Sequence, residues 1–96
     1  MNGFTVNELC EILNGKLVNY QKDLVINNFE FDPVHFNDNH PGNCFISISR
    51  ERWNQSNKVQ TNWIDGNKKI LDHFHKCSLI ITETPVEELK ERVTQL

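Results

Sequence analysis

Short apolar segments with strand character alternate along this 96-residue chain with segments of helical spacing. Strand-like stretches lie at 16–19, 24–31, 43–49 and 78–82. Strands separated by helices favour one sheet with helices packed against it. The element order α-β-β-β-α-β-α therefore predicts the α/β class, with a small mixed sheet of about four strands flanked by helices. The length suits a single hydrophobic core, so residues 1–96 are expected to form one domain.

The first helix has unusually complete start signals. Thr5 and Glu8 form a Thr-x-x-Glu capping box, and Leu9, Ile12 and Leu13 follow at helical spacing on one face. The pair Asn14-Gly15 is expected to end this helix, with the glycine in the left-handed conformation that closes many helices.

Four further expectations concern the segments around the strands. A bulge is expected near Asn27-Asn28, and the stretches 35–42 and 50–56 are polar enough to be loops. Apolar residues from 59 to 74 recur at helical spacing, and Asp65-Gly66 is expected to split them into two helices. A second capping box at 84–87 predicts a last helix that runs to the final residue. Because this helix has no stop signal, the chain is expected to be part of a longer enzyme.

Composition and charge exclude several classes. The net charge is −3 and no basic stripe is present, so nucleic acid is not an expected partner. No apolar run approaches the ~18 residues of a membrane span, and the N-terminus does not resemble a signal peptide. Cys10, Cys44 and Cys77 lie in or beside apolar segments, where reduced thiols are expected. These features predict a cytoplasmic protein without a membrane partner.

No complete catalytic set is present in the sequence. It contains neither a Gly-x-x-x-x-Gly-Lys-Ser/Thr loop nor a Gly-x-Ser-x-Gly elbow, so no catalytic residue is assigned. His73, His75 and Cys77 are possible metal ligands, but helix positions two apart point about 200° apart. A structural zinc site needs four ligands. A surface histidine pair beside a buried cysteine is therefore favoured over a metal site.

Two polar segments follow predicted strands, at 32–34 and 50–54. Open α/β sheets bind ligands on the loops beyond their strand ends. Arg50 or Arg52 could pair with a diphosphate through two hydrogen bonds. Trp53 could stack on a pyrimidine or bury itself against a helix, and burial is the more common role for tryptophan.

The ordered motifs resemble the N-terminal domain of the Mur ligases that add the third amino acid, or the terminal dipeptide, to UDP-N-acetylmuramoyl peptides. The family's helix pattern "thr-x-x-glu-leu-x-x-x-leu-x-gly-x-leu" is matched by FTVNELCEILNGKL. Its strand ending in Asp-Ser-Arg corresponds to NFEFDPV, and its turn and strand PGDLFVAL to PGNCFISIS. Its loop GERFDG corresponds to RERWNQ, and its closing strand and boundary to SLIITETP. The resemblance covers nearly the whole chain.

This resemblance implies a Mur ligase N-terminal domain-like fold that binds the UDP portion of UDP-N-acetylmuramoyl peptide. The parent enzyme would be an ATP-dependent amide-forming ligase of peptidoglycan precursor synthesis. This domain would need no cofactor, because the missing central and C-terminal domains of the same chain would supply the ATP, Mg and amine sites. By position, the implied substrate-binding residues are Phe31, Asp32, Pro33, Arg50, Glu51, Arg52, Trp53 and Asn54.

The chain departs from the family pattern in both loops. Pro33-Val34 replaces Ser-Arg, which removes a hydroxyl and a guanidinium, and Arg50 and Gln55 replace two glycines. These departures favour a runner-up of another class, in which the same fold has lost nucleotide binding and serves as a structural or docking module. A free-standing metal or redox protein would rest only on the cysteines and histidines and is the weakest alternative.

Overall fold

Four parallel strands form the main sheet of the computed structural model, which describes residues 3–20, 24–36 and 42–96. The strands are β3 (Asn28–Glu30), β4 (Asn43–Ile46), β5 (Leu79–Ile81) and β6 (Thr94–Gln95), in that spatial order. A separate antiparallel ribbon joins β1 (Phe4–Thr5) to β2 (Val25–Ile26). The expected α/β class with a small four-stranded sheet is confirmed. Among the described residues, antiparallel pairing occurs only in the ribbon and in one bridge beside β6.

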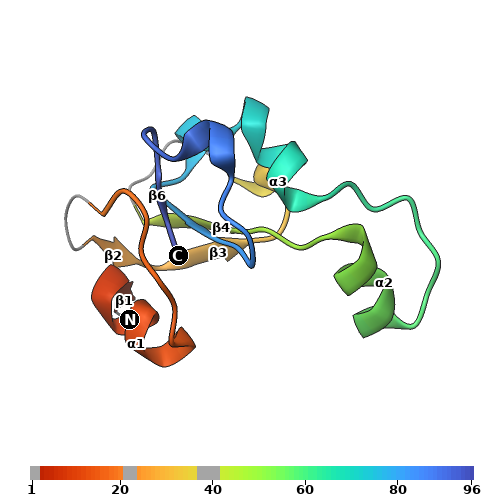
Figure 1. Cartoon of the computed structure of the whole chain (residues 1–96), viewed down its shortest axis with the longest axis horizontal. Coiled ribbons are helices and arrows are strands. Elements are labelled where there is room, and N and C mark those ends of the chain that lie inside the picture. The colour runs from red at the N-terminus through yellow and green to blue at the C-terminus, as the bar shows by residue number, and fades with distance from the viewer. Residues whose placement is uncertain (1–2, 21–23, 37–41) are drawn as a thin grey trace.

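Helical segments cover both faces of the main sheet, as the parallel topology requires. The helix α1 (Val6–Leu13) lies on one face, and α3 (Gly66–Lys69) lies on the other (Figure 1). The remaining helical segments are α2 (Arg50–Asn57) and the 3-10 turns η1 (Pro33–His35), η2 (Ile70–Asp72), η3 (Phe74–Lys76) and η4 (Glu87–Leu89).

Each sheet face has its own hydrophobic core, because neighbouring strand residues point to opposite sides. Cys44 belongs to the core under α1, whereas Phe45 belongs to the core under α3. The α1-side core contains Val6, Leu9, Ile26, Cys44, Leu79 and Leu96. The opposite core contains Phe36, Phe45, Ile70, Cys77, Ile80, Val86, Leu89 and Val93.

The expected capping box of α1 is confirmed. The Thr5 hydroxyl accepts a hydrogen bond from the Glu8 amide, and the Glu8 carboxylate accepts one from the Thr5 amide. The helix ends one residue earlier than expected, because Asn14 and not Gly15 adopts the left-handed conformation, with φ 51°. A Cβ at Gly15 would lie 2.6 Å from Leu96 Cδ1, so a larger residue there would have to move the end of the Leu96 side chain.

The first two expected strands are shorter than the pattern indicated. Residues 16–19 form no strand and make only a single antiparallel bridge, between Val18 and Gln95. The stretch 24–31 breaks at Asn27, near the expected bulge, into β2 and β3, which belong to different sheets. The amides of Asn27 and Asn28 both donate to the Gly42 carbonyl at this break. Of the polar loop expected at 35–42, residues 37–41 lie outside the described residues.

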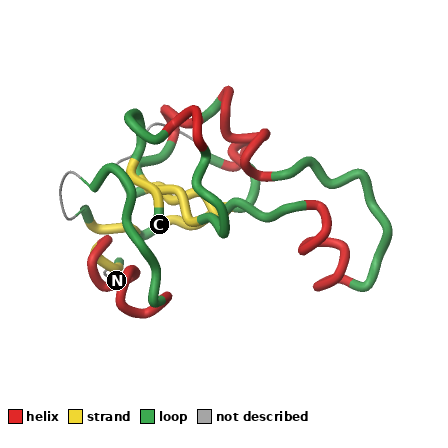
Figure 2. The backbone as a smooth tube through the Cα atoms, in the orientation of Figure 1, coloured by secondary structure: helices red, strands yellow, loops and turns green. Residues whose placement is uncertain are grey.

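The expected loop at 50–56 is wrong, because these residues form α2. The Ser49 hydroxyl caps the helix by accepting from the Arg52 amide, and Lys58, with φ 55°, ends it. The helix expected from residue 59 begins only at Gly66, so Asp65-Gly66 marks a helix start and not a division between two helices. Residues 58–65 instead form an irregular segment that returns from α2 to the sheet (Figure 2).

The helix expected from Thr84 to the last residue is also wrong. Only the short turn η4 is helical, and the chain then forms β6 beside β5. The Gln95 side chain is fully buried and binds both backbone polar groups of Val86. Pairing with β5 and burial of Val93 and Leu96 therefore override the local helix-start signal.

Candidate functional site

The two segments singled out by the sequence follow neighbouring parallel strands. The stretch 31–33 follows β3 and the stretch 50–54 follows β4, and β3 pairs directly with β4. Carboxyl ends of parallel strands lie at one edge of a sheet, which is where open α/β sheets carry their ligand sites. Thr82–Thr84 follow β5 at the same edge. This edge is therefore the candidate site.

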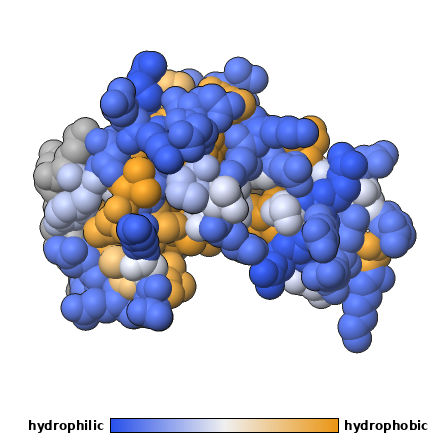
Figure 3. Space-filling view, viewed as in Figure 1, coloured by the Kyte–Doolittle hydropathy of each residue, from blue (hydrophilic) through white to orange (hydrophobic). Residues whose placement is uncertain are grey.

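A groove of about 990 Å³ lies at this edge, on the sheet face that α1 covers only in part. Figure 3 shows the molecule hollowed between the α1 end and the α2 end, with hydrophobic side chains gathered on the α1 side. Apolar side chains from α1, β4 and β5, together with that of the last residue, Leu96, line most of the groove. The lining residues are Leu13, Gly15, Lys16, Val18, Ile46, Ser47, Ile48, Arg52, Ile81, Thr82, Glu83, Pro85 and Leu96.

Eight site residues were predicted from the sequence. Of these, Arg52 alone is among the described residues that line the groove. Its guanidinium forms a two-pronged ion pair with Glu83, with Nε 2.9 Å from Oε1 and a terminal nitrogen 3.1 Å from Oε2. Both side chains are more than half exposed, at 57% and 67%. An ion pair this exposed contributes only about 0–1 kcal/mol to stability. The sequence did not identify Glu83, which lies 31 residues further along.

Trp53 stacks on Trp63, with ring centroids 3.8 Å apart and planes inclined by 8°. The Trp63 indole donates from Nε1 to the Ile48 carbonyl, and the Lys69 ammonium lies 3.8 Å from the centroid of the Trp63 ring. One face of Trp53 is thus already covered by an indole of the same chain. The sequence favoured burial of Trp53 against a helix, whereas its side chain is only partly buried and stacks on an indole of an irregular segment.

Two other predicted residues of this segment, Arg50 and Asn54, bind the returning segment 58–65. The Arg50 Nε donates to the Trp63 carbonyl at 2.7 Å, and the Arg50 amide donates to the Asp65 carboxylate at 2.6 Å. Asn54 accepts a hydrogen bond from the Thr61 hydroxyl. Glu51 is exposed in the first turn of α2. These contacts hold α2 and segment 58–65 together as a lobe that projects from the sheet (Figures 1 and 2).

The residues after β3 stand apart from the groove. Phe31 is 46% exposed, Pro33 is buried, and the Asp32 carboxylate accepts a hydrogen bond from the Val34 amide to start η1. None of Phe31, Asp32 and Pro33 is among the described residues that line the groove. The structure thus brings the two predicted segments to one sheet edge without bringing all their side chains into one cavity.

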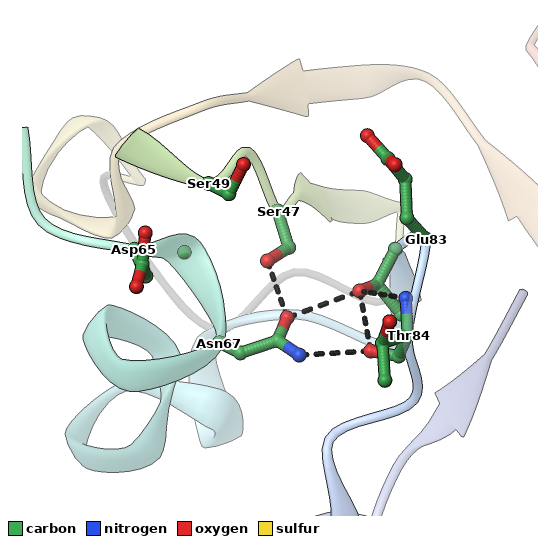
Figure 4. A pocket seen from close by; sticks show the side chains of 8 residues that line it. Ser47, Ser49, Asp65, Asn67, Glu83 and Thr84 are labelled. Atoms are coloured by element: carbon green, nitrogen blue, oxygen red, sulfur yellow. Dashed lines mark hydrogen bonds between the residues drawn. The ribbon is translucent and has the colours of Figure 1, made fainter. Parts of the chain in front are cut away.

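A smaller polar cleft of about 260 Å³ adjoins the groove and shares Ser47, Thr82 and Glu83 with it. The Asn67 carboxamide organises this cleft: its oxygen accepts from the Ser47 and Thr82 hydroxyls, and its nitrogen donates to the Thr84 carbonyl (Figure 4). Sequence reasoning missed this network, although Ser and Thr residues directly after β4 and β5 were a usable signal. The remaining lining residues are Ser49, Asp65 and Gly66.

The cysteines are free thiols, and two of them are buried. Burial raises the pKa of the Cys77 thiol to about 12, and burial followed by the proximity of Cys77 raises the pKa of Cys44 well above its ordinary range. Both thiols are therefore protonated and unreactive at neutral pH. Among the described residues, no group of three His, Cys, Asp or Glu side chains could hold a metal ion. Within the same part of the chain, no helix is long and apolar enough to cross a membrane.

Comparison with known proteins found no matching family model and no matching curated protein. The resemblance of the ordered motifs to the N-terminal domain of the Mur ligases stays a prediction.

Proposed function

We propose that this domain binds the UDP portion of a UDP-N-acetylmuramoyl peptide, as the N-terminal domain of a Mur ligase-type enzyme. The observation that carries the proposal is the groove at the carboxyl edge of the parallel sheet, with the Arg52 guanidinium on its wall. Its volume of about 990 Å³ lies at the upper end of the usual range for ligand cavities, roughly 300–1,000 Å³. The ordered motifs of the sequence provide the second line of support.

The lining of the groove suits the two chemical parts of a nucleotide diphosphate. Ile46, Ile48 and Ile81 offer an apolar surface on which a base can lie. Arg52 offers a planar guanidinium that matches phosphate oxygens through two parallel hydrogen bonds. The adjoining polar cleft, at about 260 Å³, is smaller than most ligand cavities, so the groove is the better place for the nucleotide.

The role of such a domain is positioning. Binding a remote, unreactive part of the substrate helps to hold the reacting carboxylate where the activating group needs it. The ATP and Mg of the reaction would be bound by the other domains of the parent enzyme, in the cytoplasm. No residue of this domain needs to touch the reacting atoms.

The test is an NMR titration of the domain with UDP-N-acetylmuramoyl peptide. Amide shifts are expected at 46–48, 50–54 and 82–83, which surround the groove. Arg52→Ala is expected to weaken binding by roughly 10- to 100-fold, because a hydrogen bond to a charged group contributes about 1.5–3 kcal/mol. The matched control is Lys90→Ala, whose side chain pairs with Glu87 outside the residues that line the groove. Shifts confined to α3 and η3, or equal affinities of both variants, would contradict the proposal.

A second candidate function is a structural or docking module within a larger ligase-like protein. It is favoured by the Arg52–Glu83 ion pair and the Trp53–Trp63 stack, because both already satisfy groups that a ligand would need. If this alternative holds, the nucleotide will produce no shifts at the groove at any concentration tested. Replacing Trp53 with alanine would then lower the stability of the lobe.

A further inference from the structure

The charged groups that line the groove come from separate segments, which lie near α1 and at α2 (Figure 1). Lys16 follows α1, and Arg52 lies in the first turn of α2. Glu83, after β5, also lines the groove and pairs with Arg52. Among the described lining residues there are thus two cations and one carboxylate, in a protein whose net charge is −3. The groove is a local exception to the charge of the whole molecule.

We propose that Lys16 and Arg52 form a clamp for a diphosphate, and that Glu83 is the internal counter-ion that the diphosphate displaces from Arg52. This inference rests on the proposed function, and it assigns roles to Lys16 and Glu83 that the sequence motifs do not indicate. The ligand class is a diphosphate ester, free or part of a nucleotide.

The geometry of the ion pair supports the exchange. Both nitrogens that hold the Glu83 oxygens, at 2.9 and 3.1 Å, are the donors that a phosphate would use in the same fork arrangement. The pair is more than half exposed, so water already competes for both partners. An exposed ion pair of this kind favours the paired over the separated side chains by roughly fivefold or less. A phosphate can therefore displace the carboxylate easily.

The backbone under both cations is fixed. The Arg52 amide donates to the Ser49 hydroxyl at the start of α2, which anchors the arginine to the end of β4. On either side of Lys16, the Gly15 amide donates to the Cys10 carbonyl and the Val18 amide donates to the Gln95 carbonyl. The long side chains can therefore adapt to a ligand while their attachment points stay in place at the groove.

The experiment measures dissociation constants of UDP, pyrophosphate and uridine by NMR titration of the whole chain. Glu83→Gln removes the carboxylate charge and keeps the shape, and is expected to tighten UDP and pyrophosphate about fivefold. Its matched control is Glu87→Gln, which removes the carboxylate of an exposed ion pair with Lys90. Lys16→Ala is expected to weaken both phosphates by at least threefold, whereas Lys90→Ala leaves them unchanged. Uridine, which carries no phosphate, is expected to bind all four variants equally.

The outcomes separate the clamp from the proposed function. If UDP and pyrophosphate bind and neither Glu83→Gln nor Lys16→Ala alters them beyond the controls, the clamp is overturned and the nucleotide site remains. If pyrophosphate follows the expected pattern while UDP binds no better than pyrophosphate, the clamp holds and the nucleotide function fails. If neither phosphate binds at the groove, both are overturned. Circular dichroism of each variant confirms that the fold is retained.

Discussion

Replacing Gln95 with leucine removes a buried carboxamide that links β6 to Val86, the residue before η4. The side chain is fully buried, accepts a hydrogen bond from the Val86 amide and donates one to the Val86 carbonyl at 3.0 Å. Its own backbone is held independently, because Gln95 and Val18 exchange two backbone hydrogen bonds. The substitution therefore tests the carboxamide and leaves the strand pairing in place.

The expected loss of stability follows from these two contacts. A buried polar group left without a partner costs about 1–3 kcal/mol, and the variant leaves two such groups at Val86. Leucine fills a similar volume and regains part of this cost through its apolar surface. We expect a net decrease of about 2–4 kcal/mol in the free energy of unfolding, a large share of the stability of a small domain.

The assay is urea unfolding followed by circular dichroism, with amide hydrogen exchange as a local readout. The Val86 amide should exchange much faster in Gln95→Leu than in the parent protein. The control Gln55→Leu changes an exposed glutamine of α2 and should stay within about 0.5 kcal/mol. A loss below about 1 kcal/mol, or an unchanged exchange rate at Val86, would refute the bridging role.

Three other predictions concern the core and the lobe. Burial raises the pKa of Cys77 from 9.0 to about 12. The contribution of this thiol to the free energy of unfolding is therefore complete below pH 9 and is lost as the pH rises toward 12. Comparing urea unfolding of the parent and Cys77→Ala from pH 8 to 11 should therefore give a less steep fall in the variant. Gly15→Ala should lower stability by about 1 kcal/mol, because the new Cβ forces the end of the Leu96 side chain to move, and a neutral result in thermal unfolding would argue against this contact. Trp53→Ala should abolish the near-ultraviolet circular dichroism of the Trp53–Trp63 stack, and a retained signal would count against the stacked geometry.

The parts of the fold that could be predicted from the sequence are those whose signals are local. The capping box of Thr5 and Glu8 starts α1 through contacts three residues apart, and the apolar stretches around Phe45 and Ile80 form β4 and β5. Two elements depended on distant contacts. No side chain within α2 is buried, so no apolar periodicity marks it, and its Ser49 cap is the only clear local signal. The strand β6 exists because it pairs with β5, which no local pattern reveals.

The same distinction applies to the candidate site. The sequence placed Arg52 at a strand end, and the structure puts it at the carboxyl edge of the sheet. Its partner Glu83 is brought to the groove by the pairing of β4 with β5, and the segment of Lys16 is joined to the sheet by the bridge between Val18 and Gln95. The apolar spacing from residue 59 onward placed Trp63 in a helix. In the structure it lies in an irregular segment and stacks on Trp53.

Contacts between a bound nucleotide and the groove would test the central claim most directly. We predict intermolecular nuclear Overhauser effects between the uracil protons of bound UDP and the methyl groups of Ile46, Ile48 and Ile81. Effects seen only to methyl groups on the α3 side of the sheet, such as those of Ile70 and Leu89, would contradict the placement of the nucleotide in this groove.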